Sequence, residues 1–296
     1  TELAFVAAGN IFMGMTESPV LIKNYLPTMN RSEIFLVMVS GMGTIAGSVM
    51  GTYIGMLGGT DPAAKVLFAT HLLSASVMAV PGSIVLAKML CPQTEEATDH
   101  VAISGKEKEN SNILDAISSG TVTGVKLMTN IAAMLLVFIS LVALANYITE
   151  GVIGRYTGLN DWIVKITDGK AQGLTFQFIL GVITSPFMWL IGVPSQDIML
   201  VGSLLGQKTI LNEFVAYFQL QQWKDAGLFM YEKSILMSTY ILCGFANISS
   251  IGILLGGLGV LAPEKRGLIS RIGVPAMIGG ALVSVLSATI IGMILG

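Results

Sequence analysis

Two acidic residues lie inside otherwise apolar stretches of the sequence. Glu17 lies in GNIFMGMTESP, and Glu213 lies in GQKTILNEFVAY. A carboxylate at bilayer depth costs at least about 2.5 kcal/mol on insertion scales, so such a residue usually faces a polar cavity and serves function. The competing interpretation is a structural pair with a buried lysine such as Lys208. The segments 1–27 and 195–223 are too short and too interrupted for plain spans. We therefore expect two re-entrant hairpins whose tips line a polar site.

Small and polar residues interrupt two longer apolar stretches, GMGTIAGSV at 41–49 and GFANISSIG at 244–252. A broken helix frees backbone carbonyls, and carbonyl, Asn and Thr oxygens together suit a hard monovalent cation. Asn247 and Ser250 are three residues apart and would share one face of a helix. Taken alone, these two are more typical of polar contacts between packed helices. With Glu213 as an acceptor, the set suits a neutral, hydroxylated solute framed by apolar walls.

The sequence indicates no other chemistry. We find no nucleophile–base pair, Gly-rich phosphate loop or metal-ligand cluster, and we expect no enzymatic activity. His71 titrates near neutrality and is a possible proton relay, although a histidine packed against a neighbour is the more common case. Cys91 and Cys243 are expected to be free thiols. A net charge of −2 offers no basic surface for nucleic acid.

Membrane-spanning helices are the elements that would position these residues. Of the 296 residues, 53% are hydrophobic and 11% are charged, whereas soluble domains carry about 25% charged residues. A span needs about 20 apolar residues. The stretches that qualify are 33–57, 63–90, 125–149, 174–193, 232–260 and 269–295. Charges gather in the connections 92–112, 150–173 and 261–272, and the basic last connection is expected in the cytoplasm.

The hairpins and interrupted spans occur twice, in the same order. Each acidic tip is followed by an interrupted span and then by one more long apolar span. Interrupted segments at matching positions of two halves point to a transporter site between inverted repeats. We predict an all-α integral membrane protein built from an inverted repeat of hairpin, broken transmembrane helix and transmembrane helix. Inverted halves need an odd number of crossings between them, so we expect that either 125–149 or 174–193 does not cross as an ordinary span. The first repeat is expected over 1–91, a polar loop with interfacial or scaffold helices over 92–193, and the second repeat over 194–296.

Four segments resemble motifs of the concentrative nucleoside transporter family. Residues 206–216, GQKTILNEFVA, fit the motif G-x-K-x3-N-E-F-V-A in full, and residues 245–252, FANISSIG, differ from F-A-N-F-S-S-I-G only at Ile248. TIAGSV at 44–49 and HLLSASVM at 71–78 fit two further elements. The resemblance covers nearly the whole chain and is specific, because several long motifs occur in order. It implies that the family's first three spans, part of a scaffold domain, lie outside this chain.

The resemblance to bacterial members of that family implies ion-coupled secondary active import of nucleosides by an elevator mechanism. It also implies a homotrimer in the plasma membrane, the inner membrane of a bacterium. The implied substrate-binding residues are Met15, Thr16 and Glu17 near the base, Glu213, Asn247 and Ser250 at the ribose, and Val49 and Phe245 alongside. The implied sodium ligands are Asn10, Met13, Thr44 and Ile45. No cofactor is implied. The alternatives are a proton as coupling ion, a different nucleobase-like or hydroxylated solute, and an uncoupled nucleoside carrier.

Met15 departs from the family pattern. The first hairpin tip in the family usually reads G-Q-T-E or G-Q-S-E, whereas residues 14–17 here read GMTE. A thioether is only a weak hydrogen-bond acceptor, unlike the amide that it replaces. One lost base contact costs roughly 1 kcal/mol if water takes its place. We therefore predict an altered base preference rather than a loss of transport.

Overall fold

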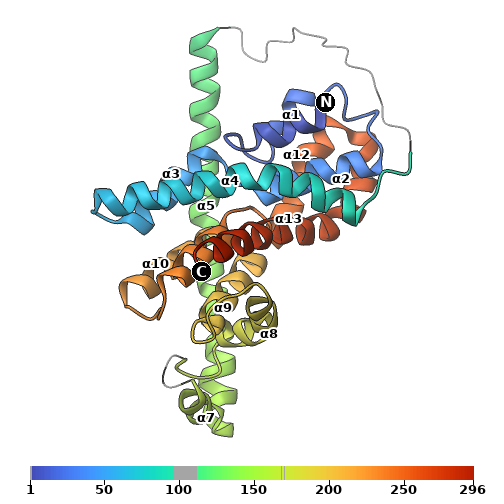
Figure 1. The fold of residues 1–296 in the computed structure, drawn as a ribbon. Coiled ribbons are helices and arrows are strands. Elements are labelled where there is room, and N and C mark those ends of the chain that lie inside the picture. The colour runs from blue at the N-terminus through green and yellow to red at the C-terminus, as the bar shows by residue number, and fades with distance from the viewer. Residues whose placement is uncertain (1, 96–111, 168, 170) are drawn as a thin grey trace. The chain divides into compact units, whose positions relative to one another are not determined.

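The computed structural model describes residues 2–95, 112–167, 169 and 171–296, and the regular secondary structure in these ranges is all helical. Most of the predicted polar loop, residues 96–111, lies outside the described residues. In chain order the elements are α1 (Glu2–Gly9), η1 (Ser18–Ile22), α2 (Arg31–Gly43), α3 (Gly47–Gly58), α4 (Pro62–Leu90), α5 (Ile113–Asn146), η2 (Tyr147–Gly154), α6 (Arg155–Thr157), α7 (Leu159–Ile166), α8 (Phe176–Leu190), α9 (Ile198–Ile210), α10 (Glu213–Asp225), α11 (Glu232–Leu242), α12 (Ile248–Leu261), η3 (Pro263–Lys265) and α13 (Arg266–Ile294) (Figure 1).

The chain forms two compact units. The larger unit contains residues 1–99 and 177–296, and the smaller contains residues 100–176. In the smaller unit, the side chain of Asn160 in α7 links η2 to the segment before α8. Its side-chain amide donates to the carbonyl of Glu150 and accepts from the backbone N–H of Leu174, both at 3.0 Å. All the predicted site residues belong to the larger unit.

Asparagine and aspartate side chains fix where four helices of the larger unit begin. Asn30 forms a capping box with Glu33 at the start of α2, and Asp61 caps α4. Asn212 and Asn247 accept from backbone N–H groups in the first turns of α10 and α12. An N-cap side chain satisfies one of the backbone donors that a helix start leaves open. These starts place Glu213 and the residues after Asn247 at the positive ends of two helices.

The two predicted interruptions are real breaks. The helix that begins at Arg31 stops at Gly43 and resumes at Gly47, and the one that begins at Glu232 stops at Leu242 and resumes at Ile248. The predicted spans 33–57, 63–90 and 269–295 are confirmed as apolar helices long enough to cross a membrane, at Arg31–Gly58, Pro62–Leu90 and Pro263–Ile294. In the stretch 174–193 the helix, α8, has only 15 residues, fewer than the roughly 20 that a span needs. This agrees with the expectation that either 125–149 or 174–193 is not an ordinary span.

The larger unit has two hydrophobic cores. Core A joins the first hairpin (residues 2–29) with α2 and α12, and its fully buried members include Val6, Leu26, Met38 and Leu254. Core B joins α9 and α10, the arms of the second hairpin, with α3 and α11, and its members include Tyr53, Leu204, Tyr217 and Ile241. The long helices α4 and α13 contribute residues to both cores.

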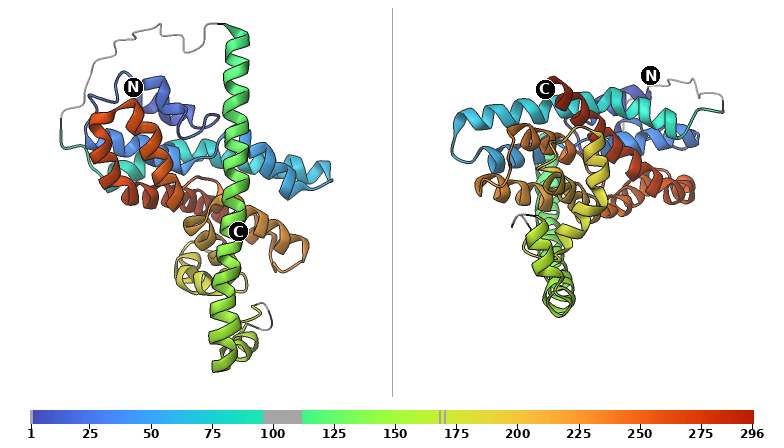
Figure 2. Two further views of the ribbon diagram at one scale, coloured as in Figure 1. Left: turned by 180° about the vertical axis from the view of Figure 1, so that it is seen from behind. Right: turned by 60° about the horizontal axis from the view of Figure 1, so that its bottom comes forward.

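Each broken helix therefore passes from one core into the other at its break. The helix of the first repeat has α2 in core A and α3 in core B, whereas the helix of the second repeat has α11 in core B and α12 in core A. Seen from behind, α1, α2 and α12 gather at one end of α4 and α13, and α3 and α10 gather at the other (Figure 2). This exchange is the pattern expected of two inverted repeats that share one site.

Candidate functional site

The carboxylate of Glu213 lies where the second hairpin meets the other repeat. Glu213 is the first residue of α10 and is only 8% exposed. Its Oε1 accepts from the Tyr53 hydroxyl at 3.3 Å, and its Oε2 accepts from Asn247 Nδ2 at 3.0 Å. The positive end of α10 stabilises a negative charge at this position. The two protein donors use only part of the acceptor capacity of a carboxylate, which has about four lone-pair sites.

Asn247 is held in one orientation by its neighbours. Its Oδ1 accepts from the hydroxyls of Ser249 at 2.6 Å and Ser250 at 3.0 Å, and from the backbone N–H of Ser250 at 2.9 Å. The side-chain N–H groups must therefore point the other way, toward Glu213. The sequence placed Asn247 and Ser250 on one helix face. In the structure Asn247 is instead the cap that precedes the helix, and the buried Ser250 hydroxyl donates to it.

Lys208 does not pair with Glu213. Its ammonium donates to the backbone carbonyl of Ile241 at 2.8 Å and to the hydroxyl of Ser284 at 3.0 Å. Within the described residues no ion pair joins Lys208 to a carboxylate. The carboxylate of Glu213 therefore remains available for a solute.

The tip of the first hairpin contributes Met15, Thr16 and Glu17. Met15 is 7% exposed and packs on Gly41 of α2, where a Cβ would lie 2.9 Å from the Met15 Cβ. Thr16 packs on Gly257 of α12, where a Cβ would lie 3.0 Å from Thr16 Cγ2. Glu17 is exposed and lies over Gly14, in contrast to the partnered, cavity-facing carboxylate that its apolar surroundings suggest. The tip is thus joined to both broken helices through Met15 and Thr16.

The two breaks touch each other. The backbone N–H of Phe245 in the second break donates to the carbonyl of Thr44 in the first break at 3.2 Å. A Cβ at the neighbouring Gly244 would lie 2.9 Å from the Met42 carbonyl oxygen and 2.9 Å from the Ser284 hydroxyl, so this approach requires glycine. The Phe245 side chain is half-buried and packs on both cores, and Val49 packs on core B. The structure therefore places Phe245 and Val49 beside the contact between the two helix breaks.

The predicted sodium ligands gather at the first break. The buried Asn10 donates through Nδ2 to the Ser40 hydroxyl at 3.1 Å, and that hydroxyl donates to the Val37 carbonyl at 3.0 Å. Since Ser40 has already used its proton, it can only accept from Asn10. This leaves Asn10 Oδ1 as a buried acceptor with no hydrogen-bond partner among the described residues. The Thr44 hydroxyl donates to the Ser40 carbonyl at 3.0 Å and keeps its lone pairs.

Met13 and Ile45 complete this predicted set. Met13 is half-buried and directly follows Phe12, whose carbonyl accepts from Gly47 at the start of α3 at 3.0 Å. Ile45 is fully buried within the break. An unpartnered amide oxygen, a hydroxyl and the carbonyl end of α2 form a donor set that fits a hard monovalent cation.

The sequence did not single out several residues of this network. Tyr53 is the most important, and it lies one helical turn after Val49, a spacing that places both on one face of α3. Ser40 and Ser249 orient Asn10 and Asn247. His71, a possible proton relay from its sequence, has its Nδ1 3.1 Å from the Tyr240 hydroxyl.

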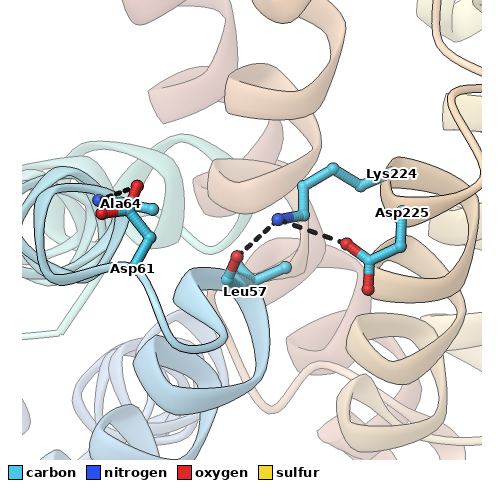
Figure 3. Close-up of polar contacts among 5 residues, drawn as sticks. All are labelled: Leu57, Asp61, Ala64, Lys224 and Asp225. Carbon is cyan, nitrogen blue, oxygen red and sulfur yellow. Dashed lines mark hydrogen bonds and ion pairs between the residues drawn. The ribbon is translucent and has the colours of Figure 1, made fainter.

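The second hairpin is also anchored away from its tip. The Lys224 ammonium of α10 donates to the Leu57 carbonyl in the last turn of α3 at 2.6 Å and lies 3.5 Å from Asp225 Oδ1 (Figure 3). At the other arm, the buried Asp197 accepts from the backbone N–H groups of Met230 and Tyr231 at 3.0 and 3.1 Å. These contacts fix the hairpin against α3 and against the start of α11.

Comparison with known proteins identifies the relatives of this arrangement. Residues 71–292 match the model of the Na+ dependent nucleoside transporter C-terminus. The chain is 40% identical to an uncharacterized transporter of Haemophilus influenzae over 98% of the chain and 65% of that protein. It is 39% identical to sodium/nucleoside cotransporter 1 of Rattus norvegicus over 97% of the chain and 43% of that protein. The chain thus spans less than two thirds of these relatives.

Solved structures of CNTnw share the fold. The structure in an inward-facing substrate-bound state has a TM-score of 0.82 and 36% identity, and the match covers 97% of this chain and 63% of that chain. A CNTnw variant in an outward-facing state has a TM-score of 0.84 and 36% identity, and the match covers 97% of this chain and 64% of that chain. Together with the sequence matches, these likenesses place the chain in a family of membrane transporters, not of enzymes. The chain belongs to the concentrative nucleoside transporter family.

Proposed function

We propose that this chain forms the substrate-binding part of a secondary active importer that couples nucleoside entry to a sodium gradient. The observation that carries the proposal is the Glu213–Asn247 pair, a nearly buried carboxylate and an oriented amide at the meeting point of both repeats. The family is that of sodium-dependent nucleoside transporters. One of its relatives is solved in a substrate-bound state.

Sugar hydroxyls are the part of a nucleoside that this pair suits. The spare lone pairs of Glu213 accept from two hydroxyls, and the second N–H of Asn247 donates to a sugar oxygen. Ser250 acts by holding the Asn247 amide in place, because its own proton is donated to Asn247 Oδ1. Phe245 and Val49 supply the apolar wall, and Met15, Thr16 and Glu17 at the first hairpin tip face the base.

Sodium is the proposed coupling ion, held by Asn10 Oδ1, the Thr44 hydroxyl and the carbonyls of Met13 and Ile45. The buried, partnerless Asn10 oxygen supports this assignment because it needs a cation or donor to offset its desolvation. Proton coupling is the alternative for the ion. A different hydroxylated or nucleobase-like solute, and uncoupled carriage, are the alternatives for the substrate and the mechanism.

Assembly and motion are proposed by similarity to the family. We propose a homotrimer in the bacterial plasma membrane, in which the two repeats at 1–91 and 194–296 move as a transport domain against a scaffold. Solved inward-facing and outward-facing states of CNTnw support an alternating-access cycle. Residues 92–193 are proposed to contain the interfacial and scaffold helices.

Uptake of labelled uridine and adenosine into proteoliposomes holding the full-length protein tests the proposal. Accumulation should follow an imposed sodium gradient, and Glu213→Gln should weaken it at least about tenfold. Hydrogen bonds to a charged acceptor contribute about 1.5–3 kcal/mol, and 1.4 kcal/mol is a factor of ten in affinity. Glu232→Gln, at an exposed acid outside the site, is the matched control. Uptake driven only by a pH gradient would refute sodium coupling, and no saturable uptake would refute the substrate.

A further inference from the structure

Lys208 is a fully buried cation that the proposed transport site does not use. Its side chain is 0% exposed, and within the described residues it has no carboxylate at ion-pair distance. Its Nζ donates to the Ile241 carbonyl at 2.8 Å and to the Ser284 hydroxyl at 3.0 Å. Burying an unpaired charge is costly unless oriented dipoles stabilise it. The structure around Lys208 must therefore supply those dipoles.

The broken end of α11 supplies them. The last carbonyls of a helix have no intrahelical partner and form the negative end of its dipole. Lys208 contacts one of these carbonyls directly, at Ile241. It reaches a second through Ser284, whose hydroxyl also lies 3.0 Å from the Cys243 carbonyl. One ammonium therefore serves two carbonyls at the break of the second repeat.

The first repeat has the same pair of elements, but among the described residues no ammonium contacts its break. Its hairpin residue Asn10 contacts the last turn of α2 through Ser40, as Lys208 of the second hairpin contacts the last turn of α11. Asn10 Oδ1 is a buried acceptor without a hydrogen-bond partner in the described part of the chain, and a cation would satisfy it. Lys208 offers the cation itself. Each hairpin therefore places a polar side chain against the end of a broken helix. In the first repeat this side chain is an acceptor, and in the second repeat it is a cation.

We propose that Lys208 is a built-in cation that occupies, in the second repeat, the place that the sodium ion takes in the first. The inference rests on the proposed function, because it takes the Asn10 site as the sodium site. A covalently attached cation stabilises the break permanently and cannot be released on the other side of the membrane. The second repeat therefore contributes no coupling ion, and the protein carries one sodium ion for each nucleoside.

Two variants of Lys208 in the full-length protein separate charge from packing. Lys208→Asn removes the ammonium, opens space and adds an acceptor like that of Asn10, whereas Lys208→Met keeps most of the volume without charge or acceptor. In choline chloride both should unfold at lower temperature than the wild type. Sodium chloride, but not potassium chloride, should raise the unfolding temperature of Lys208→Asn more than that of the wild type or Lys208→Met. The flux ratio of tracer sodium to nucleoside should rise from one toward two in Lys208→Asn.

Lys224→Met is the matched control. Lys224 lies in the same hairpin and also donates to a helix-end carbonyl, that of Leu57, but its side chain is 24% exposed and lies away from either break. This variant should gain no sodium response. Equal responses of Lys208→Asn and Lys208→Met to sodium would overturn the inference. So would a Lys208→Asn protein that stays unfolded in saturating sodium.

Failure of the proposed function has a different result. Asn10→Leu should abolish the sodium response of the wild type if the coupling ion is assigned correctly. If sodium chloride does not raise the unfolding temperature of the wild type, sodium is not the coupling ion. The proposed ratio of one sodium ion to one nucleoside then fails as well. A sodium-specific response gained by Lys208→Asn would still support Lys208 as the cation of the second break.

Discussion

Replacing Tyr53 with phenylalanine should weaken nucleoside binding while leaving the fold nearly intact. The change removes one hydroxyl, which donates to Glu213 Oε1 at 3.3 Å. The ring keeps its stack on Tyr217, with centroids 4.1 Å apart, and its contact with Phe214. A hydrogen bond to a charged group contributes about 1.5–3 kcal/mol, and this long one belongs at the lower end. We therefore expect Kd and KM to rise about tenfold.

Tyr217→Phe is the natural control for this change. Tyr217 is equally buried and lies in the same aromatic stack, but its hydroxyl donates at 2.8 Å to the Thr239 carbonyl instead of Glu213. This variant should lower the unfolding temperature and leave the affinity for nucleoside near the wild-type value. Binding is measured by calorimetry on the purified full-length protein and KM by uptake into proteoliposomes. Equal losses of affinity in both variants, or none in Tyr53→Phe, would refute a role for Tyr53 in positioning the carboxylate.

Two further substitutions test the hairpin tip and the crossing of the breaks. Met15→Gln restores the amide that the family has at the tip, and uptake measured for several nucleosides should show a changed base preference. An unchanged profile would mean that Met15, which packs on Gly41, does not face the base. Gly244→Ala should destabilise the protein by about 1–3 kcal/mol, the usual effect of overpacking, since its Cβ would lie 2.9 Å from the Met42 carbonyl oxygen. Gly252→Ala is the control, because its added Cβ would meet no atom within 4 Å apart from the backbone of its own helix. Equal effects of the two substitutions in denaturant unfolding would contradict a tight contact at Gly244.

Much of the fold was predictable because its causes are local. Breaks at 41–49 and 244–252 are visible as small and polar residues inside apolar stretches. Asparagine is also a typical helix cap, yet its spacing from Ser250 favoured a helix face for Asn247 instead of the cap that it forms. Hydropathy could not separate a crossing helix from a shorter one. By hydropathy the stretch 174–193 qualified as a span, and only the inverted repeat indicated that either it or 125–149 is not one. In the structure α8 ends at Leu190, before Gly192 and Pro194.

The site was less predictable because its contacts are distant in sequence. Tyr53 and Glu213 are 160 residues apart, and Lys208 and Ser284 are 76 residues apart. Nothing local distinguishes a lysine that pairs with a carboxylate from one that stabilises a helix end. The two acidic tips also looked equivalent in sequence, yet Glu213 is nearly buried and Glu17 is exposed. Glu213 is the first residue of the long helix α10, whereas Glu17 precedes the short 3-10 helix η1.

The contact between the breaks gives ion and nucleoside a physical reason to bind together. Thr44, a proposed sodium ligand, accepts at 3.2 Å from the N–H of Phe245, which lies two residues before the proposed nucleoside ligand Asn247. A cation that orders the first break holds the Thr44 carbonyl in place, and this in turn orders the second break. A nucleoside bound by Asn247 has the same effect in the opposite direction. Linkage requires the two effects to be equal, so the factor by which sodium raises nucleoside affinity is the factor by which nucleoside raises sodium affinity.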